Sequence, residues 1–257
     1  MFVDPGDEDD CCPPAFEWPH LFPGKIHRVR GAASFPRHAW NADILGLAIL
    51  GEFSQSDWYS AIDVPPPPDD PEPELIILFQ LAENERQDRA AEIRAQDKGF
   101  PAYLMNLLVM NRHSHPFGYD LVKAASRVGE MLMGYYKAKF DRARPTQIAP
   151  GLIWSIQPGH PSYPSGHALI SRLMARCLAE SVTVDTHKEA LIALADRIGR
   201  NREIAGLHYP SDTAAGVSIA DQAFEKVLSK GPAFNKLLGQ AANEWAALSA
   251  GSHVLGP

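Results

Sequence analysis

The stretch PSGHALISRLMARCL, residues 164–178, places a polar tetrapeptide directly before an apolar helical segment. In this position the Ser165 hydroxyl and the amide groups of the first helical turn face an incoming anion. Gly166 lets the backbone approach that anion closely, because glycine carries no side chain. The stretch therefore predicts an anion-binding helix start, with His167 beside it.

The stretch KAKFDRARP, residues 137–145, supplies two cationic side chains upstream of the tetrapeptide. Lys137 and Arg144 are seven residues apart, about two helical turns, so both side chains can project from one side of the segment. Lys139 and Arg142 lie on other faces, and we expect both to be solvated surface charges.

The stretch REIAGLHYPSD, residues 202–212, adds an arginine, a histidine and an aspartate. Gly206 breaks the helix between Arg202 and His208, so that both side chains turn inward. A carboxylate bonded to one imidazole nitrogen fixes the tautomer and stabilises the cation that develops on the ring. Asp212, four residues after the histidine, suits that role, and His208 is the predicted nucleophile.

Together the three stretches predict a pocket for a tetrahedral oxyanion, with two histidines on opposite sides of its central atom. The spacing Lys-x6-Arg-Pro, Pro-Ser-Gly-His and Arg-x5-His-x3-Asp resembles that of the type 2 phosphatidic acid phosphatases and their relatives, the bacterial class A acid phosphatases and the vanadium haloperoxidases. The resemblance covers residues 137–212. It implies an all-α helical bundle whose motifs lie at helix ends around one pocket.

The resemblance also implies a role for each motif residue. His208 attacks the central atom, while His167 protonates the leaving oxygen and then activates water. The family's third motif usually opens with serine, where this chain has Asn201. His160 is placed at the pocket rim by similarity to some vanadium bromoperoxidases. The residues expected to bind the oxyanion are Lys137, Arg144, Ser165, Gly166 and Arg202.

The 257 residues, 45% of them hydrophobic, suffice for a large core. We expect an extended N-terminal arm over residues 1–37 and a single helical catalytic domain over residues 38–257. No stretch alternates apolar and polar residues as a strand would. Cys177 is expected in the core. Predicted helices cover residues 40–53, 73–97 with an end at Lys98-Gly99, 101–112, 118–142, 166–181, 186–205, 211–229 and 232–249.

Charge and hydropathy exclude several partners. A formal net charge of -7 argues against a nucleic-acid partner, since no excess of basic residues exists to neutralise a phosphate backbone. No apolar run approaches the roughly 20 residues that a membrane-spanning helix needs. The N-terminus shows no secretory signal, which predicts a soluble, cytoplasmic protein. The sequence leaves open whether the chain forms a homo-oligomer.

Three functions are compatible with these residues. The first is a soluble phosphatase that hydrolyses small phosphomonoesters through a phosphohistidine, with no metal and no cofactor. The second is a vanadate-dependent haloperoxidase, which holds vanadate on His208 and oxidises halides with hydrogen peroxide. Chain length favours the phosphatase, whereas His160 and Ala168 favour the haloperoxidase. The third, a catalytically silent helical binding protein, requires all seven motif positions to be coincidental.

Overall fold

The computed structural model describes residues 40–249, and the expected N-terminal arm over 1–37 lies outside them. Within the described residues the chain is helical and contains no strand, which confirms the all-α prediction. The helices are α1 (Ala42–Ser54), α2 (Trp58–Ala61), α3 (Glu72–Asn84), α4 (Arg86–Leu107), α5 (Pro116–Phe140), α6 (Pro145–Ile148), η2 (Pro150–Leu152), α7 (Gly166–Ser181), α8 (Asp185–Ile204), α9 (Pro210–Lys226), η3 (Leu228–Lys230) and α10 (Pro232–Ser249).

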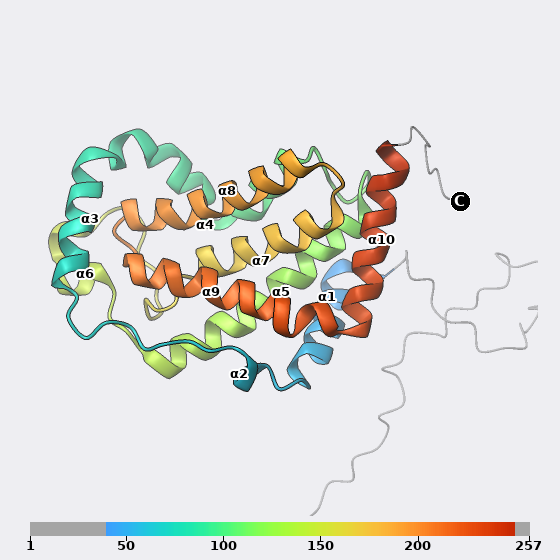
Figure 1. Cartoon of the computed structure of the whole chain (residues 1–257). Helices are drawn as coiled ribbons and strands as arrows, with labels where there is room; N and C mark the ends of the chain where they lie inside the picture. Colours follow the sequence, from blue (N-terminus) through green and yellow to red (C-terminus); the bar gives the residue numbers. More distant parts are fainter. Residues whose placement is uncertain (1–39, 250–257) are drawn as a thin grey trace, which may run out of the picture. The chain divides into compact units, whose positions relative to one another are not determined.

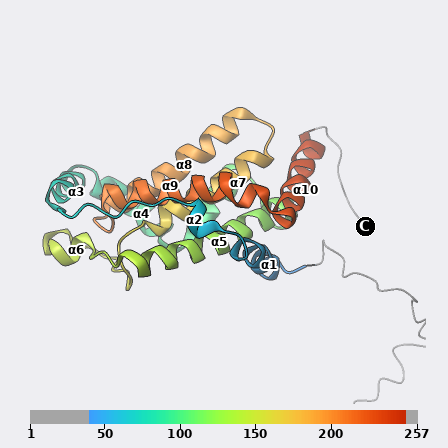
Figure 2. The ribbon, with the colours of Figure 1, turned by 60° about the horizontal axis from the view of Figure 1, so that its bottom comes forward.

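Helix α7 is the centre of the bundle, because it packs against α5, α8 and α9 (Figures 1 and 2). Its apolar residues Leu169, Leu173 and Cys177 are completely buried, as expected for Cys177. Burying one leucine side chain contributes about 1.5–3 kcal/mol to stability. The core therefore fixes α7, and with it the functional tetrapeptide at its N-terminus.

Two glycines let the neighbouring helices approach the first turns of α7. A Cβ atom on Gly216 of α9 would lie 2.7 Å from the carbonyl oxygen of Ser165 and 3.0 Å from the amide of Leu169. A Cβ atom on Gly129 of α5 would lie 2.9 Å from the Ile170 side chain. Backbone atoms cannot move aside cheaply, so the glycine in α9 is required for the close contact that builds the site.

The predicted helix over 73–97 with an end at Lys98-Gly99 is wrong. The chain bends at Glu85, between α3 and α4, and α4 then continues through Gly99 and Pro101 to Leu107 (Figure 1). Glycine and proline close together usually mark a helix end. Here tertiary contacts of α4 with α7 and α8 outweigh that local preference.

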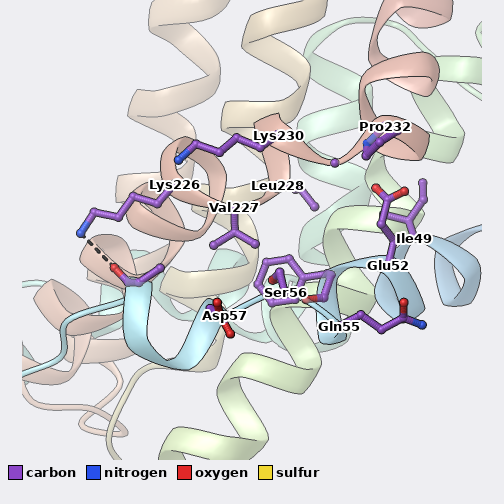
Figure 3. A pocket seen from close by; sticks show the side chains of 13 residues that line it. Ile49, Glu52, Gln55, Ser56, Asp57, Lys226, Val227, Leu228, Lys230 and Pro232 are labelled. Atoms are coloured by element: carbon purple, nitrogen blue, oxygen red, sulfur yellow. Dashed lines mark hydrogen bonds between the residues drawn. The ribbon is translucent and has the colours of Figure 1, made fainter.

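A hollow of about 350 Å³ lies between α1, α2 and the turn from α9 to α10 (Figure 3). The Glu52 carboxylate accepts the Ala233 amide at 2.9 Å and so caps the start of α10. Lys226 donates to the Ala61 carbonyl at 3.0 Å across the same hollow. These contacts join the helices at the end of the bundle away from α3 and α6.

None of the helices between residues 40 and 249 combines the length and the hydropathy that a membrane span needs.

Candidate active site

His208 and Asp212 form a buried pair where the chain leaves α8 and enters α9. His208 Nδ1 lies 3.1 Å from Asp212 Oδ2, which also accepts the Tyr209 amide at 3.0 Å and a short hydrogen bond from the Ser162 hydroxyl. A carboxylate can only accept, so His208 carries its proton on Nδ1. The lone pair is then on Nε2, which lies 3.4 Å from Nη1 of Arg144.

The surroundings keep this pair as a neutral imidazole beside a carboxylate. Burial lowers the pKa of His208 well below its usual value, against the hydrogen bond to Asp212, and the charges of Arg144 and Lys137 lower it further. Burial alone would raise the pKa of Asp212, but the hydrogen bonds and charges of His208, Ser162 and Arg142 leave it below the usual value. His208 is therefore in the form that can attack an electrophile.

Arg144 is fixed between two loops at the start of α6. Its Nε donates to the His160 carbonyl at 2.8 Å and its Nη1 to the Leu207 carbonyl at 2.7 Å. Nη2 lies 3.1 Å from Nδ1 of His160, an exposed residue at the edge of the cavity. The guanidinium is thus oriented before any ligand arrives, which is what stabilisation of a developing negative charge requires.

Arg202 and His167 lie on the side of the cavity formed by α4. Arg202 is 1% exposed, and its Nη2 donates to Asp97 Oδ1 at 2.9 Å. Its buried Nε has no hydrogen-bond partner within residues 40–249, so this donor is available to a ligand. His167 Nε2 donates to the Asp97 carbonyl at 2.9 Å. Burial, assisted by Arg202, lowers the pKa of His167 to about 3, although the carbonyl opposes the shift.

These side chains surround one cavity of about 470 Å³. Its polar side is well suited to an oxyanion, because two arginines and the first turn of α7 supply donors. The cavity also has apolar lining residues, which are Phe100, Met133, Ile156 and Ile170. The predicted residues that line the cavity are Arg144, His160, Gly166, His167, Arg202 and His208.

Residues 122–220 match the family model of the PAP2 superfamily. These residues carry the PAP2 superfamily signature. A solved structure, "Crystal structure of the first transmembrane PAP2 type phosphatidylglycerolphosphate phosphatase from Bacillus subtilis", is 15% identical to it with a TM-score of 0.44, over 71% of this chain and 92% of that one. No curated protein matches the chain.

The PAP2 segment runs from α5 to α9 and contains every predicted oxyanion-binding and catalytic residue. Three of these residues, Lys137, Ser165 and Asp212, do not line the cavity. Ser165 is fully buried as the N-cap of α7, where its hydroxyl accepts the Ala168 amide at 3.4 Å. Its position therefore supports the helix start and does not place the hydroxyl in the cavity, which differs from the expected anion contact.

Lys137 lies beneath the loop that leads to the PAP2 tetrapeptide. Its ammonium group donates to the carbonyls of Pro161 at 2.5 Å, Ser162 at 2.9 Å and Pro164 at 2.8 Å. Burial, assisted by the charge of Arg144, lowers its pKa to about 7 against the attraction of Asp212. All three ammonium hydrogens donate to the loop, so Lys137 supports the loop, and its direct contact with an oxyanion stays a prediction.

Arg142 was expected on the surface, and this expectation is wrong. Its side chain is 8% exposed and donates to Asp212 Oδ1 at 2.7 Å and to Glu74 Oε2 at 2.8 Å. The guanidinium also lies over the Tyr209 ring, 3.8 Å from its centroid. Asp141 causes the inward turn, because its left-handed backbone (φ 43°) ends α5 and reverses the chain.

Three residues near the PAP2 motifs were missed by sequence reasoning: Glu74, Asp97 and Arg142. Glu74 and Asp97 lie before the PAP2 segment, on helices α3 and α4. Neither has a spacing that relates it to a motif, so only the tertiary structure reveals the contact. Within residues 40–249 no group of three or more His, Cys, Asp or Glu side chains is arranged to hold a metal ion.

His167 and His208 predict that the ligand-free protein loses stability in mild acid. Their pKa values lie below the ordinary value of about 6.5 that they have in the unfolded chain, so only the unfolded chain takes up their protons. Their contribution is fully present above about pH 6.5 and is lost as pH falls toward the folded pKa values. Each such group adds at most about 1.4 kcal/mol per pH unit to the slope.

Urea denaturation at a series of pH values between 7 and 5 measures this slope. His167→Gln removes one of these titrating groups, so the slope of that variant should be smaller by about 1.4 kcal/mol per pH unit. A free energy of unfolding that stays constant over this range would contradict the assignment of both histidines as buried and neutral.

Proposed function

We propose that the protein is a phosphatase that hydrolyses phosphomonoesters through a phosphohistidine on His208, without a divalent metal. The observation that carries the proposal is the orientation of His208. Asp212 holds Nδ1, which leaves the Nε2 lone pair beside Arg144 at the cavity. The PAP2 superfamily signature supports the reaction class, and the substrate is a small phosphorylated compound.

In the proposed reaction the phosphoryl group binds between Arg144, Arg202 and the first turn of α7. The negative charge of the bound ester favours uptake of a proton from solvent on Nδ1 of His167. Nε2 of His208 then forms a bond to phosphorus as the bond to the ester oxygen breaks, and His167 gives that oxygen its Nδ1 proton. Asp212 stabilises the imidazolium that results. A water molecule then attacks phosphorus, gives a proton back to His167, and releases phosphate and neutral His208.

The arginines supply the charge that a divalent metal supplies in other phosphatases. Arg144 is held rigidly, and Arg202 has an unused buried donor, so both can tighten on the charge of the transition state. The electrostatic requirement is met by the chain itself.

The second candidate is a vanadate-dependent haloperoxidase that oxidises halides with hydrogen peroxide. It is favoured by the same two atoms, the Nε2 lone pair of His208 and the free Nε of Arg202. Vanadate has the shape and charge of phosphate, so these residues and Arg144 would hold it. When bound, it would supply the activation of peroxide.

We expect purified protein to hydrolyse p-nitrophenyl phosphate at the same rate with and without EDTA, and orthovanadate to inhibit competitively. Halide oxidation by vanadate-loaded protein with peroxide is measured in parallel, and dominant oxidation would select the second candidate. A His208→Ala sample prepared in the same way controls for contaminating phosphatases. Activity that EDTA abolishes and zinc restores would overturn the proposal.

A further inference from the structure

Helix α4 continues through Pro101, and this proline changes the hydrogen bonding of the turn before it. Proline has no amide hydrogen, so the carbonyl four residues earlier, that of Asp97, receives no helical hydrogen bond from it. The Asp97 carbonyl instead accepts a hydrogen bond from a residue of helix α7, because His167 Nε2 lies 2.9 Å away. The His167 side chain thus supplies a hydrogen bond in place of the one that Pro101 cannot make.

The same turn of α4 holds other parts of the site. The Asp97 carboxylate accepts Arg202 Nη2 at 2.9 Å, and the Phe100 ring packs on His167 with their centroids 4.8 Å apart. The Asn201 amide on α8 donates to Gln96 of α4 at 2.8 Å, which fixes α4 against α8. The turn is therefore held in place independently of His167.

The contact determines which nitrogen of His167 is free. A carbonyl oxygen only accepts, so Nε2 of the imidazole must carry a proton. In the neutral ring the lone pair then lies on Nδ1, the nitrogen that remains for the ester oxygen or the attacking water. The Gln96 backbone makes a smaller contribution at the ring. Loss of the stronger contact to the Asp97 carbonyl would therefore make the other tautomer more accessible, and part of the population would present the wrong nitrogen.

We propose that Pro101 is a positioning residue: by withholding an amide hydrogen, it reserves the Asp97 carbonyl for His167 and so fixes the tautomer of the proton-transfer histidine. The inference rests on the proposed function for its kinetic consequence only. The hydrogen bond and the tautomer are properties of the ligand-free protein, and they can be measured whether or not the protein is a phosphatase.

Pro101→Ala tests the proposal, because alanine returns an amide hydrogen directed at the Asp97 carbonyl. Gly99→Ala is the matched control: it stiffens the same helix, a Cβ atom there meets nothing within 4 Å, and it adds no new donor. Nitrogen NMR of the His167 ring should show protonated Nε2 in the wild type and in Gly99→Ala. In Pro101→Ala the ring should show a mixture of tautomers.

Kinetics gives the second measurement. Pro101→Ala should lose about 10-fold in kcat with an alkyl phosphate, whose leaving oxygen needs a proton, and much less in the phosphorylation step with an acidic phenol. Asp97→Ala keeps the carbonyl and removes only the partner of Arg202. Its main effect should be weaker oxyanion binding, with the same leaving-group preference as the wild type.

The outcomes separate the two proposals. An unchanged His167 tautomer in Pro101→Ala would overturn the role of the proline, whatever the activity. A tautomer change in a protein that shows no phosphatase activity would support the proline's role and refute the proposed function. Equal losses in Gly99→Ala and Pro101→Ala would show that helix stiffness, and not the returned donor, is responsible.

Discussion

His208→Ala is expected to reduce phosphate-ester hydrolysis by about 10⁴-fold or more, whatever the leaving group. The substitution removes the Nε2 atom that forms the bond to phosphorus in the proposed reaction. Rapid-quench labelling with radioactive substrate should therefore detect an acid-labile phosphoenzyme in the wild type and none in the variant.

His167→Ala is the informative partner of this variant. It removes proton donation and water activation but keeps the nucleophile, so it should still form phosphoenzyme from an aryl phosphate with an acidic phenol. The trapped species should then decay slowly. Phosphoenzyme that accumulates in His208→Ala and is missing in His167→Ala would reverse the two roles.

Asp212→Asn is expected to reduce kcat by about 10²–10⁴, by analogy with other carboxylate and histidine pairs. The amide keeps the shape of the carboxylate but not its charge, and its NH₂ group must face one of several donors: His208 Nδ1, the Ser162 hydroxyl, the Tyr209 amide or Arg142 Nη1. An amide that donates to His208 would favour the tautomer with its lone pair on Nδ1. The nucleophilic lone pair is then lost from Nε2.

Ser211→Ala is the matched control for Asp212→Asn. The Ser211 hydroxyl accepts from Arg142 at 2.7 Å and donates to Glu74 at 2.8 Å, but it does not contact Asp212 or His208. Its loss should change kcat by no more than a few-fold. Circular dichroism at the assay temperature checks that both variants are folded, because Asp212→Asn also leaves Arg142 with one fewer buried anion. Equal kcat values for Asp212→Asn and wild type would remove Asp212 from the mechanism.

The spacing of the motifs was enough to predict residues that the structure brings to one cavity. His208 and Asp212 are four residues apart at a helix start, so local geometry alone brings their side chains together. Gly166 follows directly from the sequence as well, because a helix start requires no distant contact. The all-α fold could be predicted for the same reason, since its evidence is periodicity within single segments.

What the sequence did not indicate depends on contacts between distant segments. Arg142 has the sequence pattern of a surface charge, and its burial depends on Glu74, 68 residues away. A proline inside a helix costs about 3 kcal/mol and favours a helix end at that point. In α4 the cost is met by tertiary packing, and the freed carbonyl is used by His167, 70 residues away. Local sequence patterns therefore could not predict the burial of Arg142 or the continuation of α4 through Pro101.

Glu74 and Asp97 lie before residue 122, so the segment that carries the family signature does not contain all the residues that hold the candidate active site in place. A fragment trimmed to the signature would keep both histidines and all three cations of the motifs. It would nevertheless lose an anion beside Arg142, the carboxylate on Arg202 and the acceptor of His167. Grafting this active site onto another scaffold therefore requires α3 and α4 to be transferred together with it.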